Sequence, residues 1–264
     1  MSRSDTWPEH DPAVAFYTQV SENRFASTEH TRGPWSADTQ HAGPPAALLG
    51  RAVEQLARPG MRIARITYDI ARPVPIAPLT VSATVVREGR STMIVSAAIE
   101  PYMRCTALVI RTASGVAPDI VREAPSGPAD AVPRPFIPVP YSVGYHTAME
   151  IRFVDGSFLD PGPATAWMRM RGTLVEGEKP SPLARVLVAA DSGNGLSMVL
   201  DIDKHVFVNP DLSVHLLRYP VGTWVCLKSR SYIDGAGIGF ADTELYDELG
   251  NLGRSAQSLF VNPR

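Results

Sequence analysis

Two stretches of the chain carry apolar residues at the three- and four-residue spacing of an amphipathic helix. The first follows Gly43-Pro44-Pro45 and reads AALLGRAVEQLAR, with proline in its predicted first turn. The second reads LARVLVAAD; Ser181 is its expected N-cap, Pro182 its first residue and Gly193 its exit. The pattern therefore predicts one well-formed helix in each half of the chain.

Most of the remaining apolar residues lie in short, partly alternating runs that end at glycine-containing turns, which is the pattern of antiparallel hairpins. Strands are predicted at 79–86, 92–99, 105–111, 224–232, 239–246 and 255–261. A largely apolar helix followed by such strands suggests a sheet wrapped around a buried helix. Two copies would place two sheets edge to edge with the helices inside, an α+β fold.

Prolines gather between the halves, at positions 118, 125, 128, 133, 135, 138 and 140. Because proline fixes φ and lacks a backbone donor, this stretch is a poor helix or inner strand. We expect residues 115–142 to be a linker that crosses a surface, between an N-terminal domain at 1–114 and a C-terminal domain at 143–264.

The two halves also resemble each other. The segment ITYDIARP (66–73) matches LSVHLLRYP (212–220), since both are extended runs that end in arginine and proline. Thr67 and Ser213 are 146 positions apart, and Arg104 and Arg254 are 150 apart, so the offset is nearly constant. This register indicates an internal repeat.

Composition narrows the function. Hydrophobic residues make up 44% of the 264 residues and charged residues 20%, which excludes a disordered chain. The formal net charge of -2 argues against a nucleic-acid binder. Two cysteines far apart in sequence, no signal-peptide core and no apolar run of membrane-spanning length favour a cytoplasmic protein without a membrane span.

Four short strings resemble the double-hotdog proteins of the acyl-CoA thioesterase II type. They are HAGPPAALL (41–49), RPVP (72–75), AAD (189–191) and GRSAQ (253–257). The resemblance covers residues 17–263 apart from the linker. It implies a tandem hotdog fold, hydrolysis of an acyl-CoA by water without metal or other cofactor, and a homo-oligomer.

The same resemblance implies which residues act. The family's aspartate at the hotdog helix falls on Asp191, its strand hydroxyl on Ser213 and its glutamine on Gln257. Where better-known members have threonine, this chain has serine, which keeps the hydroxyl without the β-branch. An aspartate can accept the water's proton, while a hydroxyl and an amide can hold the water.

Substrate binding is expected at the start of the first helix. Gly43 could point free backbone N–H groups at the substrate carbonyl, because a helix N-terminus favours negative charge. His41 lies two positions earlier and is a second candidate for substrate binding. One working site per chain is expected, since aligning Arg104 with Arg254 places Ala107 opposite Gln257.

Two other functions fit the same residues. His41 or His215 with a carboxylate could serve a hydratase or dehydratase, another chemistry found on hotdog folds. A chain that kept the fold and lost turnover would be a non-catalytic acyl-CoA-binding protein. Release of free thiol from an acyl-CoA separates hydrolysis from both.

Overall fold

The computed structural model describes residues 11, 13–118 and 121–264. The elements of the first half are β1 (Ala15–Ser21), β2 (Arg24–Ser27), the 3-10 turn η1 (Glu29–Thr31), α1 (Gly43–Leu56), β3 (Met61–Ile70), β4 (Pro78–Thr80), β5 (Ser82–Glu88), β6 (Thr92–Ile99) and β7 (Met103–Arg111). Those of the second half are α2 (Tyr145–Ala148), β8 (Met149–Asp155), β9 (Ala164–Met170), β10 (Thr173–Val175), α3 (Pro182–Ala190), α4 (Gly193–Leu196), β11 (His205–Val208), β12 (Asp211–Leu216), β13 (Val225–Ile233), β14 (Ile238–Asp247) and β15 (Gly250–Pro263).

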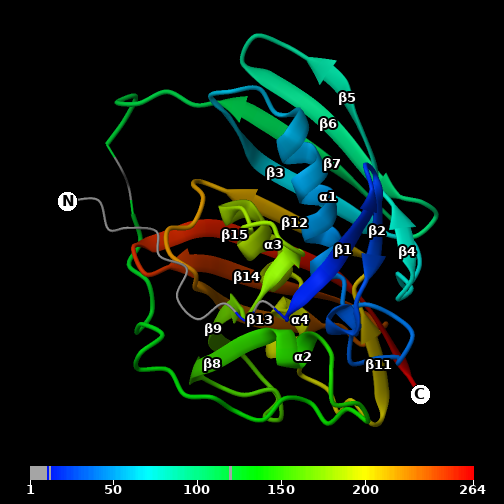
Figure 1. The fold of residues 1–264 in the computed structure, drawn as a ribbon. Coiled ribbons are helices and arrows are strands. Elements are labelled where there is room, and N and C mark those ends of the chain that lie inside the picture. The colour runs from blue at the N-terminus through cyan, green and yellow to red at the C-terminus, as the bar shows by residue number, and fades with distance from the viewer. Residues whose placement is uncertain (1–10, 12, 119–120) are drawn as a thin grey trace.

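One continuous sheet carries both halves. Its strand order is β5-β6-β7-β3-β12-β15-β14-β13-β9-β8, with β11 added beside β15. The halves join where β3 and β12 pair antiparallel, and Thr67 lies directly opposite Ser213 in this pair. The sheet curves around α1 and α3 (Figure 1). The predicted tandem arrangement, with two sheets edge to edge around two helices, is confirmed.

The two helices start as their sequences predict. Pro44 and Pro45 lie in the first turn of α1, and the Ser181 hydroxyl accepts a hydrogen bond from the Ala184 N–H at the start of α3. The prediction for Gly193 is wrong, because α3 ends at Ala190 with Asp191 as its C-cap, and Gly193 begins the short helix α4.

Small residues let α1 and α3 pack closely in opposite directions. A Cβ atom on Gly43 would lie 2.3 Å from the Val188 carbonyl oxygen, and one on Gly50 would lie 2.3 Å from Leu187 Cδ1. Near the other end of the pair, the Ser181 hydroxyl donates to the Glu54 carboxylate. The N-terminus of α1 therefore lies beside the C-terminus of α3, and this junction holds the site described below.

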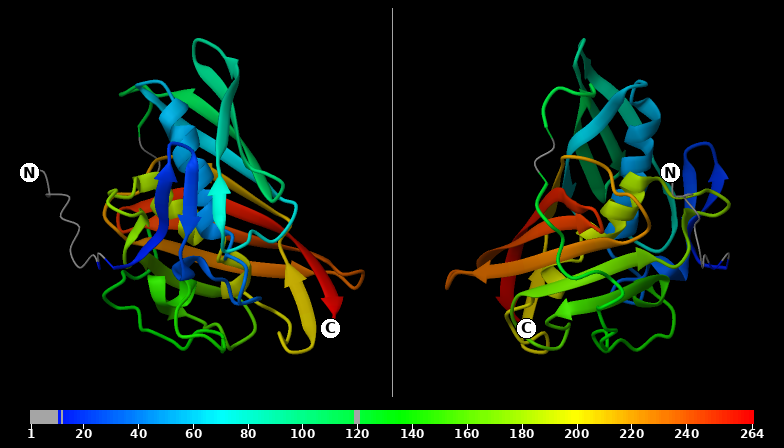
Figure 2. Two further views of the ribbon diagram at one scale, coloured as in Figure 1. Left: turned by 45° about the vertical axis from the view of Figure 1, so that its right-hand side comes forward. Right: turned by 90° about the vertical axis from the view of Figure 1, so that its left-hand side faces the viewer.

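A small second sheet, in the order β10-β1-β2-β4, is an element that the sequence pattern did not predict. The right-hand view of Figure 2 shows α1 between the β3, β6 and β7 strands on one side and the β1–β2 hairpin on the other. The apolar run at the start of β1 is short, with buried residues at its first three positions only. This small sheet buries the side of α1 that the main sheet leaves open.

The proline-rich stretch contains neither helix nor strand in its described part between β7 and α2. This stretch also packs against the second half of the chain. Ala131 and Ile137 are buried, Val132 forms an isolated bridge with Phe153, and the Trp167 indole N–H donates to the Ser126 carbonyl. Proline keeps the backbone extended, yet the intervening apolar side chains still contact residues of the second half.

No helix in the described part of the chain is long and apolar enough to cross a membrane.

Candidate active site

A cavity of about 610 Å³ opens where the start of α1, the end of α3, the end of β3 and the start of β12 meet. Apolar side chains form much of its wall: Trp35, Ile70, Val74, Phe136, Ile137 and Phe158. Polar groups cluster at the helix junction: His41, Tyr145, Asp191, Ser192, Asn194 and Asn209. An apolar cavity of this size with a few convergent polar groups is the usual form of a small-molecule site.

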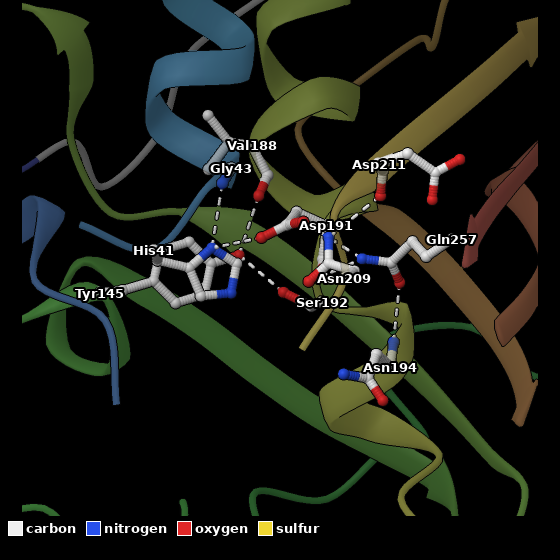
Figure 3. Close-up of polar contacts among 10 residues, drawn as sticks. All are labelled: His41, Gly43, Tyr145, Val188, Asp191, Ser192, Asn194, Asn209, Asp211 and Gln257. Atoms are coloured by element: carbon white, nitrogen blue, oxygen red, sulfur yellow. Dashed lines mark hydrogen bonds and ion pairs between the residues drawn. The ribbon is translucent and has the colours of Figure 1, made fainter. Parts of the chain in front are cut away.

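Asp191 is the buried centre of the polar cluster. Its Oδ1 accepts hydrogen bonds from Asn209 Nδ2 at 2.8 Å and from Gln257 Nε2 at 3.1 Å (Figure 3). Gln257 Nε2 also lies 3.0 Å from the Asp191 carbonyl oxygen, and its Oε1 accepts from the Asn194 N–H. The structure therefore brings together two of the three residues that the sequence analysis placed in the catalytic set.

Opposing effects set the protonation of Asp191. The end of α3 disfavours a negative charge, whereas the start of α1 favours it. The backbone N–H groups of Ala42 and Gly43 donate to the carboxylate and lower its pKa, as do Asn209 and Gln257. Burial outweighs all of these donors and raises the pKa of Asp191 to about 7. The carboxyl group is therefore able to gain or lose a proton at neutral pH.

His41 faces this carboxyl group. Its Nδ1 lies 3.2 Å from Asp191 Oδ2 and 3.1 Å from the Gly43 nitrogen. Burial lowers the pKa of His41 to about 3, so that the imidazole is neutral at pH 7. Its ring lies flat on that of Tyr145, with centroids 3.8 Å apart and planes 3° apart.

Tyr145 is held in turn at its hydroxyl. The Tyr145 hydroxyl donates to the Val188 carbonyl oxygen at 2.9 Å and lies 2.9 Å from Ser192 Oγ, which can donate to it. Tyr145 is the first residue of α2, directly after the proline-rich stretch, and Val188 belongs to α3. The imidazole plane is therefore fixed by contacts from both helices.

The expected role of Gly43 is wrong in its detail. Its N–H does not point freely into the cavity, because it donates to His41 Nδ1 and to the Asp191 carboxylate. Pro44 and Pro45 have no N–H groups, which leaves few free donors at the start of α1. The helix terminus therefore stabilises the Asp191–His41 pair.

Ser213 does not reach the site, which corrects its predicted catalytic place. It pairs with Ala256 across β12 and β15, so Ser213 and Ala256 share one face of the sheet. Gln257 follows Ala256 and points to the other face, toward the helices. The Ser213 hydroxyl instead donates to Thr67 Oγ1 at 3.2 Å. His215 shares the face of Ser213 and is exposed, so it also lies away from Asp191.

Several residues of the site were missed by the sequence analysis. Asn209 lies in the turn before β12 and occupies the place beside Asp191 that had been expected of a strand hydroxyl. Tyr145, Ser192 and Asn194 complete the supports. An asparagine before a proline is usually a turn residue, and nothing in the sequence separates Asn209 from the other turn asparagines.

The first half contains a reduced version of the same arrangement. The Glu54 carboxylate of α1 accepts from Ser181 Oγ at the start of α3, as the Asp191 carboxylate at the end of α3 contacts His41 at the start of α1. Ala107, which the repeat aligns with Gln257, is fully buried and offers no polar group. Segments 70–73 and 208–210 line the main cavity. Their equivalents in the internal repeat, 146 positions away, are 216–219 and 62–64. These equivalent segments line a smaller cavity of about 270 Å³.

Comparison with known proteins identifies the class. The acyl-CoA thioesterase N-terminal domain profile matches residues 31–110, and the acyl-CoA thioesterase C-terminal domain profile matches residues 127–261. The chain therefore belongs to the acyl-CoA thioesterase family with two hotdog domains. Comparison with curated protein sequences gave no significant match.

Solved structures share the fold over almost the whole chain. The acyl-CoA thioesterase II TesB2 of Mycobacterium marinum is 14% identical with a TM-score of 0.68, and the match covers 94% of this chain and 96% of that one. The tesB protein of Mycobacterium avium subs paratuberculosis is 17% identical with a TM-score of 0.64, over 94% and 96%. A hot dog protein of unknown function from Alicyclobacillus acidocaldarius is 18% identical with a TM-score of 0.70, over 93% and 95%.

Proposed function

We propose that this chain hydrolyses the thioester of an acyl-CoA to the free acid and CoA, within the cavity at the helix junction. The observation that carries the proposal is the ionisable pair formed by Asp191 and His41 beside an apolar cavity. The apolar wall suits an acyl chain, and the exposed Arg72 at the cavity supplies a positive charge for a CoA phosphate. Membership of the acyl-CoA thioesterase family supports the substrate class.

The reaction needs a base for water and a place for the thioester. In the ionised state the Asp191–His41 pair accepts a proton from water as the water oxygen attacks the carbonyl carbon. The tetrahedral intermediate then expels the CoA thiolate, which takes up the proton. Asn209 and Gln257 keep the carboxylate in one orientation, so that the pair is already arranged before substrate binds.

A panel of saturated acyl-CoAs with a thiol-reactive dye tests the proposal. The wild-type protein should release CoA from at least one of them. Asp191→Asn should lower kcat by about a hundredfold or more, because the amide keeps the shape but cannot accept a proton. Asp203→Asn, at an exposed aspartate, is the matched control and should keep wild-type activity. Full activity of folded Asp191→Asn would remove Asp191 from the mechanism.

A second candidate is hydration or dehydration of an acyl-CoA, because the contact between His41 and Asp191 is an acid–base pair of the kind that such chemistry uses. The same panel separates the two, since a saturated acyl-CoA has nothing to eliminate. Interconversion of an enoyl-CoA and its 3-hydroxyacyl-CoA without CoA release would favour this candidate. His215 has no part in it, because it lies on the outer face of the sheet.

We also propose that the protein acts in the cytoplasm as a homo-oligomer. Cys105 and Cys226 are both free thiols, which fits a reducing compartment. Exposed aromatic residues on the outer face of the sheet support self-association: Tyr232 and Phe240 stack with centroids 4.9 Å apart, and Phe260 lies on the same face. Light scattering after size-exclusion chromatography measures the oligomeric state directly, and a monomer at all concentrations would refute self-association.

A further inference from the structure

The oxygens of Asp191 are already used by the protein. Oδ1 accepts from Asn209 and Gln257, and Oδ2 contacts His41 Nδ1, while two backbone N–H groups also donate to the carboxylate. Its side chain is 5% exposed, against 12% for the side chain of His41. A water molecule in the cavity therefore has less access to the carboxylate than to the imidazole.

His41 holds Asp191 with one ring nitrogen, which leaves the second nitrogen, Nε2, outside that contact. Nδ1 faces Asp191, and no hydrogen bond among the described residues involves Nε2. His41 lines the cavity, and Figure 3 shows its ring stacked on Tyr145 with one nitrogen toward Asp191. Because Nδ1 and Nε2 lie on different sides of the ring, this placement leaves Nε2 available to a bound water or substrate.

The pair has two arrangements that differ by one proton. In the protonated arrangement the carboxyl Oδ2–H donates to Nδ1, and Nε2 carries the ring hydrogen. In the ionised arrangement Nδ1–H donates to Oδ2, the N–H groups of Ala42 and Gly43 donate to the carboxylate, and Nε2 has a free lone pair. Gly43 N–H lies near both partners and can serve either arrangement.

We propose that Nε2 of His41, and not an oxygen of Asp191, takes the proton from the attacking water. This inference rests on the proposed thioester hydrolysis. The water O–H bond breaks, its oxygen bonds to the carbonyl carbon, and the proton moves to Nε2. The imidazolium is stabilised by the Asp191 carboxylate at Nδ1. When the carbon–sulfur bond breaks, Nε2–H returns the proton to the CoA thiolate, which leaves the acid, free CoA and the starting pair.

The titratable groups around the pair are few. The other ionisable side chains in the cavity lining are Tyr145 and Arg72. Burial raises the pKa of Tyr145, which keeps its hydroxyl neutral and the stacked ring uncharged. Arg72 is exposed. Among the side chains that line the cavity, the Asp191–His41 pair is therefore the group whose protonation changes near neutral pH.

Two substitutions at position 41 test the proposal with the full chain. His41→Asn keeps a polar group near the place of Nδ1 and removes Nε2. It should lower kcat by about a hundredfold or more with KM changed less than about fivefold. His41→Ala should show a similar loss and should regain activity with added imidazole. His215→Asn is the matched control, because this exposed histidine lies on the outer face of the sheet and its substitution should keep wild-type activity.

The outcomes separate the inference from the proposed function. If the wild type is active and the kcat of His41→Asn lies within about fivefold of the wild-type kcat, the role of Nε2 is overturned. Thioester hydrolysis as the proposed function is not affected by that result. A wild type that releases CoA from no acyl-CoA in the panel overturns both. If neither variant folds, ¹⁵N NMR of the histidines in the wild type decides. Nε2 of His41 should lose its hydrogen as the pH rises through the transition in rate, and a protonated Nε2 on both sides would overturn the proposal.

Discussion

Asp191→Asn should make the protein more stable at pH 8 while removing activity. Burial holds the carboxyl protonated up to a pKa of about 7 in the folded chain, whereas its ordinary value is 3.8. Between these two pH values the unfolded chain has released a proton that the folded chain still holds. The contribution of the Asp191 carboxyl group to the free energy of unfolding is therefore fully present below about pH 4, and it is lost as the pH rises toward 7.

The size of this effect follows from the shift. A rise of about 3 pKa units corresponds to about 4 kcal/mol of the free energy of unfolding. The Asn side chain keeps Oδ1 for Asn209 and Gln257, and its amide can donate to His41 Nδ1. The N–H groups of Ala42 and Gly43 lose a charged acceptor, at a cost of about 1 kcal/mol each. The net gain at pH 8 is then about 2 kcal/mol.

Urea denaturation at pH 5, 6, 7 and 8 measures the free energy of unfolding of both proteins. The difference between Asp191→Asn and wild type isolates residue 191, because other titrating groups contribute to both proteins. That difference should grow in favour of the variant with rising pH, while Asp203→Asn should follow the wild type at every pH. A difference that is constant with pH, or that grows in the opposite direction, would refute the assignment of a raised pKa to Asp191.

Three further outcomes follow from the site. The kcat/KM of the wild type should rise tenfold per pH unit below about pH 7 and level off above it, because the ionised pair is the base and the pKa of Asp191 is about 7; a flat profile from pH 5 to 8 would contradict this. Ser213→Ala should keep kcat within about twofold, because the Ser213 hydroxyl contacts Thr67 on the outer face of the sheet. A hundredfold loss of kcat in the thiol-release assay would return Ser213 to the mechanism. Phe136→Ala should shift the preferred substrate to a longer acyl chain, because Phe136 and Phe158 form part of the cavity wall with ring centroids 4.7 Å apart. An unchanged preference across the acyl-CoA panel would show that the acyl chain binds elsewhere.

Hydrophobic spacing and local turn chemistry were enough to predict much of the fold from the sequence. The periodic apolar residues of α1 and α3, the prolines at their first turns and the Ser181 cap act within a few residues, so they can be read without knowledge of the tertiary structure. The 146-residue offset between Thr67 and Ser213 indicated an internal repeat, and the structure shows that these two residues lie opposite each other where β3 pairs with β12. The β1–β2 hairpin was missed because its apolar run is short and is stabilised by packing on α1 and by the parallel pairing with β10.

The site was only partly determined by the sequence. Asp191 and Gln257 could be placed from a resemblance, and His41 and Gly43 from their position before a helix. Which polar groups face Asp191 depends on the register of β12 against β15 and on which face of the sheet each side chain takes. That register turns Ser213 outward and leaves the place beside the carboxylate to Asn209. The pairing of His41 with Asp191 depends on the antiparallel packing of α1 on α3, which joins residues 150 positions apart and which no local pattern contains.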